Sequence, residues 1–145
     1  MSGGSFIQAC AIRVRYSETD KMGIVYNANY LVWFEIARTE YCRIIGRTYR
    51  SWEEDGYFLP VTESYCKYIF PAEYDDLAEL YCRAPLEQIK PHSILFEYKI
   101  KLNAKTLSEG WTKHAFVNPE GKIYRKNNKF QQWLIGESGK NAAFM

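Results

Sequence analysis

The chain has 145 residues, which is enough for one domain with a sizeable core of its own. Hydrophobic residues make up 47% and charged residues 25%, a composition typical of a folded globular protein and not of a disordered one. The formal net charge of only +2 offers no clustered basic excess, so general nucleic-acid binding is not expected. We expect a single domain spanning residues 1–145.

The cysteines, histidines and apolar runs narrow the class of protein further. The four cysteines form no C-x-x-C pair and have no zinc-site spacing, and the two histidines lie far apart, so neither a metal nor a cofactor is predicted. No run approaches the ~18 apolar residues of a membrane-spanning helix, and no signal-peptide pattern is present. These features favour a cytoplasmic protein with free thiols that does not enter a membrane.

The first third of the chain predicts a strand, a loop and a long helix. Residues 1–5 are expected to be flexible. Alternating apolar residues predict a strand over 9–17, with Tyr16 on its apolar face. A loop over 18–28 precedes a helix over 29–45 that is apolar on more than one stripe, so we expect other structure to surround that helix on most sides.

The remainder of the chain mostly has the two-residue period of strands. A connecting segment with a short helical turn is expected first, and residues 123 onwards predict an edge strand or a short helix, with a loose tail over 137–145. Between them, strands are predicted at 60–70, 77–86, 93–102 and 110–117. One helix and an antiparallel sheet that curls around it predict an α+β fold.

Asp20 is the first candidate for chemistry. An aspartate beside the turn glycine Gly23 is commonly a turn or helix-start residue, stabilised by the positive end of the helix dipole. The start of the following helix, which Asn27 or Asn29 can cap, also offers unpaired backbone N–H groups. A carboxylate facing such groups is the pairing that acyl transfer needs, because one attacks or activates water while the others hold the oxyanion.

Other polar side chains have simpler interpretations. Glu35 is a second candidate for chemistry, but its spacing favours an ion pair with Arg38 along the helix, and Glu18 is expected to be solvated. His114 lies mid-strand and is interpreted as a packed or surface histidine. Lys90 and His92 either meet phosphates at the mouth of a pocket or are simply solvated.

Two sequence blocks resemble those of a known family. The first runs Thr19-Asp20-x-x-Gly23-x-Val25-Tyr26-x-x-x-Tyr30 and continues as Trp33-Phe34-Glu35-x-Ala37-Arg38. The second is Tyr68-x-x-Pro71-Ala-x-Tyr-Asp75-Asp76. Together with smaller matches over about residues 9–125, they are similar to the hotdog-fold acyl-CoA thioesterases, in particular the 4-hydroxybenzoyl-CoA thioesterase-like family and its Tol–Pal-associated short-chain branch.

This resemblance implies a fold, an assembly and a reaction. The fold would be a single hotdog domain, with five or six antiparallel strands wrapped around one long central helix. The protein would form a homodimer, or a homotetramer that is a dimer of dimers, with the active site at the dimer interface. It would hydrolyse a coenzyme A thioester to a free acid and coenzyme A, without a cofactor.

The resemblance also assigns residues. Asp20 would be the nucleophile or the general base, the Asn27 backbone N–H would polarise the thioester carbonyl, and Tyr16 would lie near the aspartate. Substrate contacts would come from Gly23, Tyr26, Tyr30, Lys90 and His92, the last two near the nucleotide phosphates. Relatives commonly carry histidine where this chain has Asn27. Asparagine takes up no proton near neutral pH, so this position argues against a histidine-assisted mechanism. It weakens the assignment of the substrate more than the assignment of the reaction.

Alternative functions remain open at this level. A thioesterase acting on acyl-carrier-protein thioesters fits the same residues. A non-catalytic acyl-thioester-binding protein would keep the fold, although the presence of Asp20 argues against it. A hotdog dehydratase is disfavoured, because its chemistry needs a histidine near the helix start.

Overall fold

The structure is a computed structural model that describes residues 5–143. Five antiparallel strands form one sheet in the order β1-β3-β4-β5-β2. Their bounds are β1 (Ile7–Arg13), β2 (Val61–Tyr68), β3 (Leu77–Arg83), β4 (Ser93–Leu102) and β5 (Lys105–Ala115). The β4 bounds and its inward positions are as predicted, since Ile94, Phe96, Tyr98 and Ile100 are all buried.

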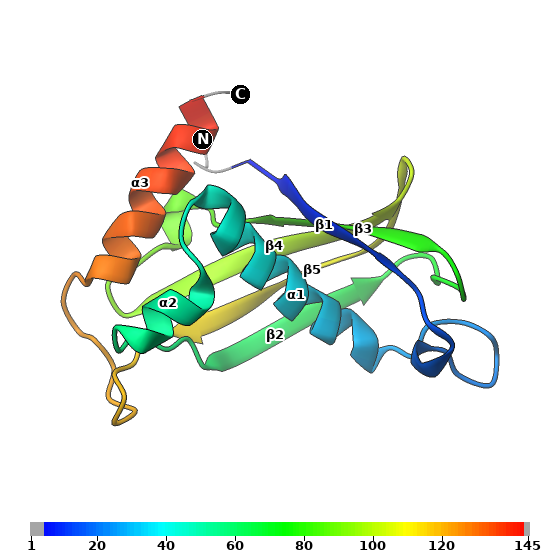
Figure 1. Cartoon of the computed structure of the whole chain (residues 1–145), viewed down its shortest axis with the longest axis horizontal. Helices are drawn as coiled ribbons and strands as arrows, with labels where there is room; N and C mark the ends of the chain where they lie inside the picture. The colour runs from blue at the N-terminus through cyan, green and yellow to red at the C-terminus, as the bar shows by residue number, and fades with distance from the viewer. Residues whose placement is uncertain (1–4, 144–145) are drawn as a thin grey trace.

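The long helix α1 (Ala28–Ile45) lies across one face of this sheet (Figure 1). Its buried positions recur every three or four residues, as expected for one helix face packed on a sheet: Tyr30, Trp33, Phe34, Ala37, Arg38, Tyr41, Cys42 and Ile45. The predicted α+β fold, with a five-stranded sheet around one long helix, is confirmed. The prediction that other structure surrounds α1 on most sides is not confirmed, because Leu31, Val32 and Ile44 are exposed in the single chain.

A glycine lets helix and sheet approach closely near the middle of α1. A Cβ atom on Gly110 of β5 would lie 2.1 Å from the Tyr65 carbonyl oxygen and 2.9 Å from the Phe34 ring. Without that atom, the Phe34 ring stacks on Tyr98 at a centroid distance of 4.4 Å. Any larger residue at 110 would collide with the β2 backbone and with the Phe34 ring, so it would disturb both the β2–β5 pairing and the packing of α1 on the sheet.

The first strand is shorter than predicted. It ends at Arg13, after which a 3-10 turn, η1 (Tyr16–Glu18), redirects the chain. The expected position of Tyr16 on the apolar strand face is therefore wrong. Its ring is 75% exposed and lies 4.3 Å from that of Tyr74.

The far end of α1 is closed by two further helices, α2 (Tyr49–Glu54) and α3 (Lys129–Ala143) (Figure 1). The predicted loose tail is wrong over 137–143, which continue α3, with Ser138 fully buried. Phe130, one of the buried anchors of α3, stacks on Trp52 at 4.6 Å. The predicted flexible residues 1–4 and 144–145 lie outside the described part of the chain.

Candidate active site

The loop between η1 and α1 is held by its own backbone. The Asp20 N–H donates to the Ile24 carbonyl at 2.8 Å, and the Gly23 N–H donates to the Asp20 carbonyl at 3.0 Å. Gly23 has a φ of +79°, which residues with a side chain rarely adopt. The two residues that bracket this turn, Asp20 and Ile24, both line the pocket described next.

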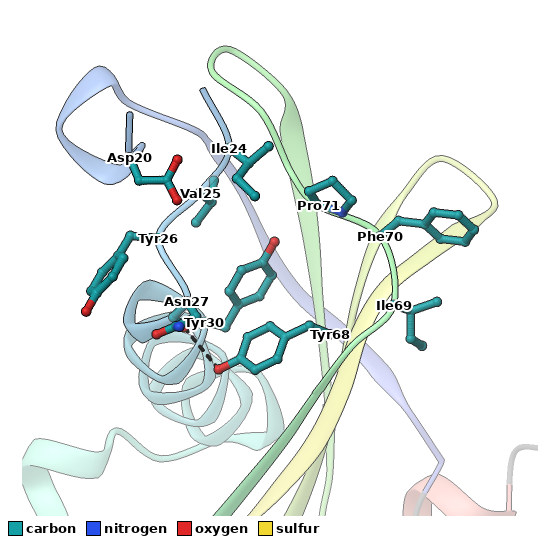
Figure 2. A pocket seen from close by; sticks show the side chains of 10 residues that line it. All are labelled: Asp20, Ile24, Val25, Tyr26, Asn27, Tyr30, Tyr68, Ile69, Phe70 and Pro71. Atoms are coloured by element: carbon teal, nitrogen blue, oxygen red, sulfur yellow. Dashed lines mark hydrogen bonds between the residues drawn. The ribbon is translucent and has the colours of Figure 1, made fainter. Parts of the chain in front are cut away.

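Asp20 lines a pocket of about 420 Å³ at the start of α1, here called the Asp20 pocket. Its carboxylate points into the opening beside Val25 (Figure 2). One carboxylate oxygen accepts the Met22 N–H at 2.8 Å, which fixes the side chain without covering it. The side chain is exposed, so the carboxylate can reach a ligand.

Aromatic and aliphatic side chains form most of the pocket wall. The lining residues are Asp20, Ile24, Val25, Tyr26, Asn27, Tyr30, Tyr68, Ile69, Phe70 and Pro71 (Figure 2). A mostly apolar pocket with a few convergent polar groups is the usual form of a small-molecule site. Tyr68 is half-exposed, and its neutral hydroxyl is one of these polar groups.

The helix mouth supplies the second polar element of the pocket. Asn27 is the N-cap residue of α1, but its side chain makes no capping hydrogen bond. Within the described residues the Asn27 N–H has no acceptor, while the Asn27 carbonyl accepts the Tyr68 hydroxyl at 3.2 Å. An unpaired N–H at the positive end of an 18-residue helix is suited to hold a developing negative charge.

The second sequence block packs directly against the first. The Ala72 carbonyl accepts the Val25 N–H at 2.8 Å, and the Ala72 N–H donates to the Tyr30 hydroxyl at 3.1 Å. Ile24 and Glu73 form an isolated antiparallel bridge. The two blocks therefore build opposite walls of one pocket, although about fifty residues separate them in the sequence.

Glu18 is the site residue that the sequence analysis missed. It was expected to be solvated, but it is buried, with 6% exposure. Its carboxylate accepts the Trp33 indole N–H and the Arg15 backbone N–H, both at 2.9 Å. Its carbonyl accepts the Tyr26 N–H at 2.8 Å and the Asn29 side-chain amide at 2.9 Å.

Glu18 thus ties the Asp20 loop to the first two turns of α1. Burial alone would raise the pKa of this carboxyl, but the hydrogen bonds from Arg15 and Trp33, together with the Arg15 charge, hold the pKa below its ordinary value. The carboxylate is therefore ionised at neutral pH. The presence of a tryptophan fifteen residues later was the only sequence signal for this pairing.

Comparison with known proteins identifies the family. Residues 14–135 match the thioesterase-like superfamily. The chain belongs to this superfamily. It is 35% identical over 124 residues to a putative acyl-CoA thioesterase YneP of Bacillus subtilis, covering 84% of this chain and 88% of that protein. It is 36% identical over 108 residues to the acyl-CoA thioesterase YbgC of Haemophilus influenzae, covering 74% and 78%.

Solved structures agree with this thioesterase assignment and with the hotdog fold. A hypothetical protein from Thermus thermophilus superposes with a TM-score of 0.79 at 28% identity, covering 91% of this chain and 96% of that one. A DHNA-CoA thioesterase from Staphylococcus aureus superposes with a TM-score of 0.77 at 26% identity, covering 97% and 91%.

The structure brings together only some of the residues predicted for the thioesterase site. Asp20, Tyr26, Asn27 and Tyr30 line the Asp20 pocket, and Gly23 shapes the turn beside it. Tyr16 precedes the loop but does not line the pocket. The role of Tyr16 beside Asp20 therefore stays a prediction.

Lys90 and His92 lie at the opposite end of the sheet in the single chain. They follow the 3-10 turn η2 (Leu86–Gln88), and the His92 carbonyl accepts the Phe116 N–H just beyond the end of β5. Tyr68 of the pocket instead pairs with Ser108 near the beginning of β5. Ser108 and Phe116 are eight residues apart along this strand, a distance of roughly 27 Å.

Two further interpretations of polar residues are corrected or confirmed. Glu35 is exposed and forms no ion pair with Arg38 in the described part of the chain, so the predicted helix pair is wrong. Arg38 instead is buried and donates to the Tyr98 hydroxyl at 3.1 Å. His114 is a packed histidine, one of the two predicted alternatives.

The free state of the cysteines is confirmed, since Cys10, Cys42, Cys66 and Cys82 are all unpaired. Over residues 5–143, no helix has the length and apolar character that crossing a membrane requires.

Proposed function

We propose that this protein hydrolyses acyl-CoA thioesters with Asp20 as nucleophile or general base and the Asn27 backbone N–H as the donor to the thioester carbonyl. One observation carries the proposal: an exposed carboxylate and an unpaired helix N-terminal N–H line the same pocket. The names of the relatives, acyl-CoA thioesterases, support the substrate class.

Two routes use the same groups. In one, an Asp20 oxygen attacks the thioester carbonyl, the C–S bond breaks, and water hydrolyses the resulting anhydride. In the other, Asp20 takes a proton from a water that adds to the carbonyl carbon. In both routes the carbonyl oxygen becomes negative, the Asn27 N–H and the α1 dipole stabilise it, and coenzyme A leaves as a thiolate that is then protonated.

The Asn27 side chain takes no part in proton transfer in either route. An amide does not protonate near neutral pH, so the proton must pass through Asp20 and water. The contribution of position 27 is then mainly its backbone, and substitutions that keep the start of the helix should be tolerated better than changes at Asp20.

The coenzyme A contacts proposed for Lys90 and His92 require a second copy of the chain. Within one chain Lys90 and His92 lie at the other end of β5 from Tyr68 of the Asp20 pocket, so we expect the nucleotide part of a substrate in that pocket to meet them only on a second copy. An exposed edge strand, β2, and exposed apolar residues on α1 support association into a homodimer or a dimer of dimers with the site at the interface.

The test is release of coenzyme A thiol over a panel of short-chain, long-chain and aromatic CoA esters. Turnover of at least one ester supports the proposal. Binding of esters without thiol release would favour a non-catalytic acyl-thioester-binding protein. Release only from acyl-carrier-protein thioesters would keep the chemistry but replace the substrate.

A further inference from the structure

Two tyrosine rings form a corner of the Asp20 pocket, here called the Tyr30–Tyr68 corner (Figure 2). Tyr30, in the first turn of α1, is only 3% exposed, and its hydroxyl accepts the Ala72 N–H. The Tyr68 ring, at the end of β2, meets the Tyr30 ring edge to face at a centroid distance of 5.2 Å. Because the Tyr68 hydroxyl donates to the Asn27 carbonyl, this side chain connects the end of β2 to the start of α1.

The reacting groups determine which part of a thioester faces this corner. In the proposed hydrolysis the thioester carbonyl lies between the Asp20 carboxylate and the Asn27 N–H. The acyl group and the coenzyme A arm leave that carbonyl in different directions. Coenzyme A has a long arm that ends in a charged nucleotide, and a corner closed by two rings and a hydrogen bond cannot contain it. The acyl group therefore points towards Tyr68.

The walls beside the corner are suited to a hydrocarbon. Ile24, Val25, Ile69 and Pro71 line the same pocket. Of the described residues that line it, only Asp20 is charged. A charged or strongly polar acyl group would lose its hydration there without gaining a partner, so the pocket favours an uncharged, apolar acyl group.

Tyr68 differs from Tyr30 in how far the fold depends on its ring. The Tyr30 ring belongs to the buried core and lies 5.0 Å from the ring of Trp33. Tyr68 is 49% exposed on an edge strand, and its hydrogen bond to Asn27 is long at 3.2 Å. Side chains alternate along a strand, so the face of β2 that presents Tyr68 continues with the partly buried Cys66. A smaller residue at 68 would therefore deepen the pocket towards Cys66 without opening the core.

We propose that Tyr68 is the specificity-determining residue that limits the length of the acyl group. This inference rests on the proposed hydrolysis at Asp20 and adds its substrate class, which is uncharged acyl groups short enough to end at the Tyr68 ring. A longer chain collides with the ring, which holds its carbonyl away from Asp20 and from the Asn27 N–H. An apolar pocket discriminates by roughly 10- to 200-fold for one methylene group, so a single wall is sufficient.

The test is kcat/KM for thiol release from a series of straight-chain CoA esters that includes butanoyl-CoA and octanoyl-CoA. The readout is the octanoyl to butanoyl ratio within one variant, because any loss of folded or assembled protein cancels in that ratio. Tyr68→Ala removes the ring and should raise the ratio by at least about tenfold. An unchanged ratio in Tyr68→Ala would overturn the proposal.

Two matched variants separate the ring from other effects. Tyr68→Phe keeps the ring but loses the hydrogen bond to Asn27, so the ratio should stay close to that of the unaltered protein. Tyr65→Ala removes an exposed ring of the same strand that stacks on Trp111 at 5.9 Å, and it should also leave the ratio unchanged. A rise in Tyr68→Phe as large as in Tyr68→Ala would assign the limit to the hydrogen bond and overturn the proposal.

Dissociation constants distinguish a failure of this inference from a failure of the proposed hydrolysis. They are measured for the same esters with position 68 varied in Asp20→Asn proteins, so they require no turnover. If no ester released thiol but Tyr68→Ala still strengthened octanoyl-CoA binding relative to butanoyl-CoA, the hydrolysis would be refuted and the length limit supported. Thiol release with unchanged ratios of kcat/KM and of dissociation constants would support the hydrolysis and refute the limit.

Discussion

The two ends of α1 differ in what they leave exposed. At the start of the helix Asp20, Tyr26 and Asn27 are exposed around a pocket, and a backbone N–H lacks a partner. At the far end the Trp52 and Phe130 rings stack nearly parallel, at 4° and 4.6 Å, within an aromatic cluster that includes Trp133. The closed end has the packing that stabilises a fold, while the open end has unsatisfied groups that a substrate can satisfy.

The largest effect on stability is expected at the closed end. Phe130→Ala removes a fully buried ring that packs against Trp52 of α2 and against Phe116, which follows β5. This loss should lower the free energy of unfolding by about 3–5 kcal/mol. Urea denaturation followed by circular dichroism measures this. Tyr26→Ala at the open end is the comparison, with an expected loss below about 0.5 kcal/mol because its ring is 54% exposed. Similar losses at the two ends would break the contrast.

The next effect is acid sensitivity of the packed region around His114. Burial and the Arg38 charge lower the pKa of His114 from 6.5 to about 4 in the folded chain. Between these values the unfolded chain binds a proton that the folded chain does not, so stability present above pH 6.5 is lost progressively as pH falls towards 4. The loss amounts to roughly 3 kcal/mol.

Urea titrations between pH 4.5 and 7.5 check this prediction. His114→Gln should flatten the dependence of unfolding free energy on pH, whereas His92→Gln, at an exposed position, should retain it. An unchanged slope in His114→Gln would place the acid sensitivity elsewhere.

A smaller effect on stability is expected at Glu18, where the substitution should also lower activity. Glu18→Gln keeps the size but offers one acceptor oxygen where two N–H donors, from Trp33 and Arg15, now point. One buried donor loses its partner, which should cost about 1–3 kcal/mol. Because the loop that carries Asp20 would shift, turnover should fall by at least roughly tenfold.

Glu73→Gln is the control, since Glu73 is an exposed carboxylate of the opposite pocket wall. It should change neither stability nor turnover appreciably. If Glu18→Gln behaved the same way, the open end would not depend on this buried carboxylate for its geometry.

Patterned segments were predictable from the sequence, and paired contacts were not. The periods of β4 and α1 identified these elements because each repeats over ten or more residues. The continuation of α3 past Gly136 was missed, since glycines and polar residues obscure its helical period. Its stability comes from tertiary contacts of residues such as Phe130 and Leu134.

The site was predictable in the same uneven way. The Asp20 turn and the helix mouth are local, so neighbouring residues indicated both. Glu18 was misread because its partner Trp33 lies two turns into the helix, and solvation is the common state of a loop glutamate. Arg38 was paired with Glu35 on spacing alone, but Tyr98, sixty residues away, holds it instead.

The central claim is that Asp20 performs the chemistry at an otherwise preformed site. Thiol release by Asp20→Asn, compared with the unaltered protein on its best CoA ester, tests this most directly. We predict a fall in kcat of about two to three orders of magnitude with an unchanged melting temperature, because the exposed side chain contributes little to the fold. Near-normal hydrolysis by a folded Asp20→Asn protein would contradict the account.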